Sequence, residues 1–152
     1  MEHRAVLIMR RALLLIVLLF ICAGGHAGPD TVVLVVSSES RVENLSPIEV
    51  RKLFLGFPVL VDGALLHPLR NRSDPRLDPI FFQQIVAMSD EAYDRQILIG
   101  VNRQGRLPPV ELRNRERVLQ ALYSDPRAVS FVWLRDVAQD PRIRVIRVLW
   151  DD

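Results

Sequence analysis

Side chains that could bind an oxyanion gather at one point of the sequence, at Arg70, Arg72 and Ser73. An arginine offers a forked pair of N–H donors to an oxyanion, and a serine adds a hydroxyl group. The segment lies between an expected strand and an expected helix, whose N-terminus would add free N–H groups and a positive dipole end. This pattern predicts a site for a small anion or polar ligand at the junction.

Ser38 is a further candidate for the same site, because it directly follows an expected strand at Thr31–Ser37. Ligands in open α/β sheets bind outside the carboxyl ends of the strands. If the two strands run parallel, Ser38, Arg70 and Ser73 meet at one edge of the sheet. We therefore include Ser38 in the predicted ligand site.

A second interpretation of these residues involves no ligand. Arg70 and Arg72 would then be solvated or would pair with Asp74 and Asp78, and Ser73 would only cap the following helix. Capping serines and surface arginines are common in proteins, so the residue types alone leave both interpretations open.

No arrangement of residues in the sequence indicates catalysis. After residue 27 the only histidine is His67, which falls in an expected strand, where a structural or surface role is usual. No cluster of histidine, cysteine and carboxylate residues has metal-ligand spacing, and neither a nucleophile elbow nor a glycine-rich phosphate loop occurs. We expect a binding protein without catalytic activity, cofactor or metal.

Residues 1–27 have the three parts of a secretory signal peptide. Three arginines precede an uninterrupted apolar run at 12–22, and small residues follow up to Ala27. The run fits a signal peptide and is short for a membrane span, which needs about 20 residues, although an uncleaved anchor is the alternative. We expect residues 28–152 to form one periplasmic or secreted domain, with no later segment that could cross a membrane.

Removal of this leader would balance the charge of the protein. The leader holds three of the 20 Lys and Arg residues and one of the 18 Asp and Glu residues, so 17 of each remain. The sequence pI of about 9.2 therefore belongs to the chain with its leader and does not argue for nucleic-acid binding, and we expect no nucleic-acid partner. The only cysteine, Cys22, also lies in the leader, so the remaining domain cannot form a disulfide.

Strand and helix patterns alternate along residues 28–152, which predicts an α/β domain. The β-branched run Thr31–Ser37 indicates a strand that is buried on both faces, as in a parallel or mixed sheet. Ser46-Pro47-Ile48-Glu49 is a helix start with a capping box. We expect a single three-layer domain with a mixed, mostly parallel sheet. The further expected elements are a strand at 65–69, a helix from Asp74 or Asp78 to Val86, helices beginning at Ser89 and Asn114, and strands at 129–133 and 143–149.

Several segments resemble one protein family, and they occur in that family's order. Residues 44–56 are similar to the L-S-x-x-E-L-x-x-I-F-L-G stretch of phosphate-binding proteins, the type II periplasmic proteins that serve phosphate ABC transporters. Residues 67–74 resemble the strand end and small-residue turn of that family. The pattern Tyr93, Ile97, Gly100, Gly105, Arg106, Pro108, Pro109 and the segment 118–132 continue the resemblance, which covers roughly residues 32–149.

The resemblance implies the fold of one lobe of a type II periplasmic binding protein. It also implies binding of phosphate or another small anion, together with a membrane transporter or a sensor protein as partner. Three segments depart from the family: Ser73-Asp74-Pro75 replaces its S-G-T turn, Asp94 replaces a tryptophan, and residues 127–131 replace its G-A-I-G-Y turn. An acid at an anion-binding turn would repel the anion. The alternative is therefore a periplasmic interaction or signalling module that has lost its ligand cleft.

Overall fold

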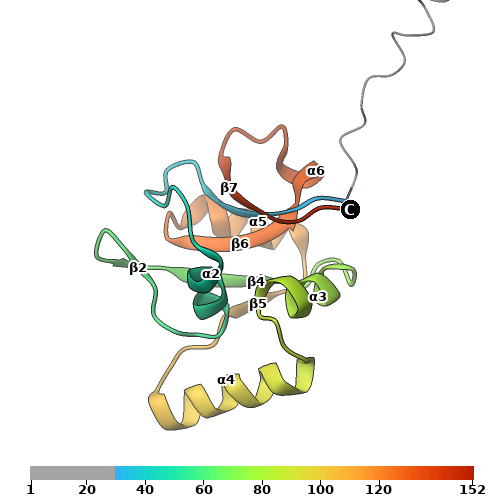
Figure 1. Cartoon of the computed structure of the whole chain (residues 1–152). Helices are drawn as coiled ribbons and strands as arrows, with labels where there is room; N and C mark the ends of the chain where they lie inside the picture. Colours follow the sequence, from blue (N-terminus) through green and yellow to red (C-terminus); the bar gives the residue numbers. More distant parts are fainter. Residues whose placement is uncertain (1–29) are drawn as a thin grey trace, which may run out of the picture.

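The computed structural model describes residues 30–152, so the predicted signal peptide at 1–27 lies outside the described residues. Strands and helices alternate along the chain, as expected for an α/β domain (Figure 1). In chain order the elements are β1 (Val32–Ser37), α2 (Pro47–Phe54), β2 (Leu60–Val61), β3 (Ala64–Leu65), β4 (His67–Asn71), α3 (Leu77–Ile80), the π-helix η1 (Phe81–Ile85), α4 (Asp90–Gln104), β5 (Val110–Leu112), α5 (Arg115–Ser124), β6 (Ala128–Trp133), α6 (Leu134–Val137) and β7 (Ile143–Trp150).

Five of these strands form one sheet with the order β5-β4-β6-β1-β7. Strand β4 pairs in parallel with both β5 and β6, whereas β1 pairs antiparallel with both β6 and β7. Four strands therefore run in one direction, and β1 runs against them. This arrangement confirms the predicted α/β class and the mixed, mostly parallel sheet.

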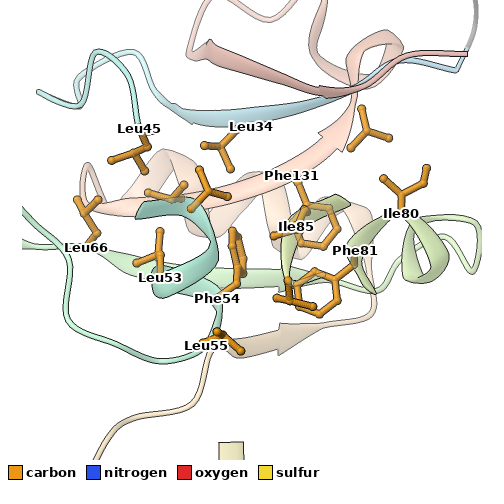
Figure 2. Packing of buried hydrophobic residues seen from close by; sticks show 14 of the residues in the cluster. Leu34, Leu45, Leu53, Phe54, Leu55, Leu66, Ile80, Phe81, Ile85 and Phe131 are labelled. Atoms are coloured by element: carbon orange, nitrogen blue, oxygen red, sulfur yellow. The ribbon is translucent and has the colours of Figure 1, made fainter. Parts of the chain in front are cut away.

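Apolar layers cover both faces of the sheet. On β1, Val32, Leu34 and Val36 point to one layer while Val33 and Val35 point to the other, and all five are fully buried. The first layer holds α2, α3 and η1, and Figure 2 shows Phe54, Phe81 and Phe131 packed together in it. The second layer holds α5 and α6. The strand buried on both faces is thus confirmed.

Helix α2 begins as its sequence predicts. The Ser46 side chain accepts a hydrogen bond from the Glu49 N–H group, and the Glu49 carboxylate accepts one from the Ser46 N–H group. This reciprocal pair satisfies two N–H groups that have no acceptor within the helix. Gly56 follows the helix with a φ of +77°, a conformation that glycine adopts without strain.

Some elements differ from the expectation. The expected strand at 65–69 is displaced, because Ala64–Leu65 pairs with Leu60–Val61 in a small hairpin and the main-sheet strand begins only at His67. The three-residue strand β5 was not expected, since it follows a segment rich in glycine and proline. Its neighbour β4 supplies the ladder that holds it, and this pairing is not visible in local sequence.

Within residues 30–152, no helix is both long and apolar enough to span a membrane. The same residues contain no group of three or more histidine, cysteine or carboxylate side chains that could hold a metal ion.

Candidate functional site

Arg70 is buried near the carboxyl end of β4, with only 3% of its surface exposed. Its guanidinium carbon lies 4.5 Å from the ring centre of Phe81, and 5.0 Å from the ring centres of both Phe82 and Tyr93. A cation surrounded by aromatic faces is stabilised by their quadrupoles. Burial is the largest cause that raises the pKa of the Tyr93 hydroxyl to about 12, so this ring stays neutral.

Two carboxylates neutralise Arg70 and its neighbour Arg72. The Glu111 carboxylate accepts hydrogen bonds from Arg70 Nη1 at 2.9 Å and from Arg72 Nη1 at 3.3 Å. The Asp78 carboxylate accepts from Arg70 Nη2 at 3.4 Å and from Arg72 Nη2 at 3.2 Å. Two cations and two anions form a closed network, which matches the second interpretation for Asp78. Asp74 instead pairs with Arg76, at 2.8 Å between Oδ2 and Nη2.

Ser73 lies next to this network, half-buried, and its N–H group donates to the Asn71 side chain at 3.0 Å. Its predicted helix is only the short α3, whose cap position is Arg76 and has no side-chain hydrogen bond. Ser73 therefore does not cap α3. Its role as a ligand residue, like that of Arg70 and Arg72, stays a prediction.

The placement of Ser38 beside these residues is wrong. Strand β1 runs antiparallel to β6, whereas β4 runs parallel to β6, so β1 ends at the edge where β4 begins. Ser38 follows the end of β1, and its N–H group donates to the Arg142 carbonyl at 2.8 Å. Ser38 and Arg70 thus lie at opposite edges of the sheet, and one small ligand cannot contact both.

A pocket of about 420 Å³ lies beside the network, at the carboxyl end of β5 and the N-terminus of α5. We call it the β5–α5 pocket, and its lining residues are Glu111, Leu112, Arg113, Asn114 and Arg117. Within residues 30–152 neither Arg113 nor Arg117 has an ion-pair partner. The first turn of α5 also carries N–H groups without an acceptor in the helix. Arg113 and Arg117 outnumber Glu111, which already pairs with Arg70 and Arg72, so the net charge of the pocket lining is positive.

This pocket was not predicted from the sequence, although its residues follow the same pattern as Arg70–Ser73, namely arginines beside a residue that could cap a helix. Asn114 was expected to begin a helix, and its side chain accepts a hydrogen bond from the Arg117 N–H group at 3.0 Å. Arginines flank this cap in the same way that Arg72 precedes Ser73. What was not visible is that β5 precedes the cap and pairs with β4, which brings the two strand ends together. The Arg72 N–H group donates to the Leu112 carbonyl at 2.8 Å across this pair.

No protein-family model and no curated protein matches this sequence. Solved structures do match its fold. A putative phosphate ABC transporter substrate-binding protein with bound phosphate from Clostridium perfringens has a TM-score of 0.58 at 10% identity, over 78% of this chain and 44% of that one. PstS from Borrelia burgdorferi has a TM-score of 0.56 at 11% identity, over 77% and 46%. The chain shares its fold with one part of each of these substrate-binding proteins. It spans less than half the length of these two structures.

The glycines of the resemblance have structural roles in this fold. A Cβ atom on Gly56 would lie 3.0 Å from the Leu107 carbonyl oxygen, so a larger residue there would press against the loop before β5. A Cβ atom on Gly100 would lie 2.5 Å from the Arg106 guanidinium. Arg106 in turn donates to the Leu55 carbonyl at 3.0 Å. These positions join α2 to the loop between α4 and β5.

Asp74, the acid that departs from the family turn, is held ionised by its neighbours. The hydrogen bond from Arg76 is the largest cause that lowers the pKa of Asp74 from 3.8 to about 2, and Trp133 Nε1 adds a bond at 3.0 Å. The pKa is lower in the folded than in the unfolded protein. The ionised carboxylate therefore stabilises the fold above about pH 4, and this contribution disappears as the pH falls through about 2.

We expect acid to destabilise the wild-type protein more steeply than the Asp74→Asn variant between about pH 4 and pH 2. The free energy of unfolding, measured in urea at several pH values, tests this expectation. Glu43→Gln, at an exposed loop position, is the control and should retain the wild-type slope. Equal slopes for wild type and Asp74→Asn would contradict the assignment.

Proposed function

We propose that this protein is an exported, non-catalytic binding domain that holds a small oxyanion such as phosphate in the β5–α5 pocket. The observation that carries the proposal is the pair Arg113 and Arg117, two cations without a carboxylate partner in the described residues, beside a helix N-terminus. Helix N-termini bind anions through free N–H groups and the helix dipole. The pocket also lies at the carboxyl ends of parallel strands, where α/β folds bind ligands.

The fold supports the proposal at a coarser level. The two similar structures are described as a phosphate transporter's substrate-binding protein and as PstS. By analogy, the bound anion would be delivered to an ABC transporter or would signal to a sensor protein in the membrane. The predicted signal peptide at residues 1–27 would place the domain outside the cytoplasm, in the periplasm or secreted.

The site in this proposal differs from the one that sequence alone predicts. Arg70 and Arg72 already share Glu111 and Asp78, so an anion would have to displace a carboxylate to bind them. Arg113 and Arg117 require no such displacement. Arg72, whose side chain is 31% exposed, lies at the border of the pocket and could contribute after the ligand has entered.

Phosphate is expected to raise the melting temperature of the purified protein and to bind in isothermal titration, because a ligand of the folded state stabilises it by mass action. Arg113→Gln with Arg117→Gln should weaken binding by about tenfold or more, since each residue would lose a charge-assisted hydrogen bond. The double variant Arg41→Gln with Arg51→Gln removes the same charge from exposed positions away from the pocket and serves as control. Equal affinity in both double variants would exclude this pocket.

A second candidate function, a protein-interaction module, rests on α4. Only Tyr93 and Gly100 of its 15 residues are buried, while Leu98 is 60% and Ile99 is 42% exposed. In Figure 1 this helix lies apart from the sheet. Exposed apolar surface often marks a partner site. A folded protein that binds no phosphate, sulfate or carboxylate at millimolar concentration would favour this candidate.

A further inference from the structure

A large apolar groove lies at the edge of the sheet opposite the β5–α5 pocket. We call it the α2–β5 groove. It has a volume of about 590 Å³, and it lies among the end of α2, β3, the start of β4 and the loop that leads into β5. Pockets that hold small ligands have volumes of about 300–1,000 Å³ and mostly apolar walls. Of its lining residues, Leu53 and Leu66 also belong to the core in Figure 2, so the groove floor is continuous with well-packed structure.

The walls of the groove expose apolar side chains to solvent. Leu107 is 81% exposed, Val110 is 56% exposed and Leu65 is 41% exposed, and all three line the groove. Single exposed apolar residues are ordinary, but several around one concavity are typical of surfaces that bind a ligand or a partner. The hydrophobic gain from covering them would be proportional to the apolar area removed from water.

The charge of the groove is positive and uncompensated. No aspartate or glutamate lines it, and Arg106 has no ion-pair partner within residues 30–152. The Arg106 guanidinium lies over the Phe57 ring at 3.9 Å, and its Nε atom is buried without a hydrogen-bond partner in this part of the chain. The group is therefore held in place before any ligand arrives, which lowers the entropy cost of binding.

His67 is the second titratable residue of the groove. Its Nδ1 atom lies 2.6 Å from Asp125 Oδ2, and Asp125 also accepts a hydrogen bond from the Arg127 N–H group. This contact orients the imidazole ring through Nδ1, and Nε2 takes no part in it. A neutral or protonated His67 thus adds no negative charge to the groove, and Asp125 is not one of the lining residues.

From these observations we propose that the α2–β5 groove binds an amphipathic carboxylate, a small molecule with an apolar chain that ends in one carboxylate. The chain would cover Leu65, Leu107 and Val110, and the carboxylate would pair with Arg106. The charge complementarity selects this occupant over a neutral or cationic amphiphile. The proposal does not depend on oxyanion binding in the β5–α5 pocket, because the two sites lie at opposite edges of the sheet and share no lining residue.

Three probes of equal chain length test the proposal on the full protein, each below the concentration at which it forms micelles. Decanoate, decanol and decyltrimethylammonium carry a negative, a neutral and a positive head group. Isothermal titration should show that decanoate binds about tenfold more tightly than decanol, the effect of one charge-assisted pair, and that the cation binds more weakly still. Equal affinities for all three, or no binding of decanoate, would overturn the proposal.

Variants locate the site. The double variant Leu65→Gln with Val110→Gln makes two exposed positions of the groove wall polar, and it should weaken decanoate binding at least about fivefold. The control is Leu60→Gln, because Leu60 is 59% exposed outside the groove, and it should leave decanoate binding unchanged. Arg106→Gln should abolish the preference for decanoate over decanol. Because Arg106 also contacts α2, we add a second variant, Arg106→Lys, which retains the charge. This variant should still bind decanoate more tightly than decanol. Decanoate binding unaffected by the wall variants would place it elsewhere and refute the assignment.

Discussion

Replacing Phe81 with alanine is expected to lower the free energy of unfolding by about 4 kcal/mol, near the upper end for single core substitutions. Phe81 is fully buried and its ring packs against Phe54, Tyr93 and Phe131, at centroid distances of 5.9, 5.2 and 5.5 Å. It also forms one face of the aromatic surround of Arg70. Its removal would leave a cavity that joins η1, α2 and the sheet.

Urea denaturation of wild type and Phe81→Ala measures this loss, with an unchanged m-value showing that the unfolded states are comparable. Leu60→Ala is the matched control, because Leu60 is 59% exposed on the small hairpin and should change stability by less than about 0.5 kcal/mol. A loss below about 1.5 kcal/mol in Phe81→Ala would show that the ring is not the centre of the core.

Arg70→Ala is expected to cost about 3 kcal/mol, because a buried cation is removed from between two carboxylates and three rings. The side chains of Asp78 and Glu111 are 27% and 40% exposed, so water can solvate them in part after the loss. Much of the cost therefore comes from lost packing on the rings.

A cycle of variants separates packing from charge. Arg70→Met fills most of the same space without a charge, so we expect it to cost less than Arg70→Ala, about 1–2 kcal/mol. In Arg70→Met, Arg72 alone would face both Glu111 and Asp78. Adding Glu111→Gln removes one of these two carboxylates and should recover part of that cost. If Arg70→Met and Arg70→Ala were equally destabilising, the charge network would outweigh the packing, against this account.

Features set by neighbouring residues were predictable from the sequence. The capping box of α2 involves residues three positions apart, and it forms as expected. The strand predicted at 31–37, observed at 32–37, was recognised because its apolar residues must be buried on both faces wherever it pairs. Asp78 was among the expected partners of Arg70 because it lies only eight residues away.

Features set by distant residues were not predictable in this way. Glu111 lies 41 residues from Arg70 and reaches it only because β5 pairs with β4. The direction of β1 depends on β6 and β7, and the same apolar run would suit a parallel or an antiparallel neighbour. Because the direction of β1 was not known, Ser38 was predicted at the wrong edge of the sheet. The fold class followed from the order of elements, but the site followed from pairings that no local pattern contains.

The position of β1 also determines when the protein can fold. The first strand of the sheet pairs on both sides with strands near the other end of the described chain, as in the pairs of Val32 with Trp133 and with Trp150. Contacts separated by roughly 100 residues make closure slow, and neither partner exists until the ribosome has synthesised it. During synthesis β1 therefore stays unpaired until β6 and β7 have been made, and until then its valines are exposed to solvent or to a chaperone. A polypeptide that must cross a membrane before it folds would benefit from this delay, because its sheet cannot close until β6 and β7 have been synthesised.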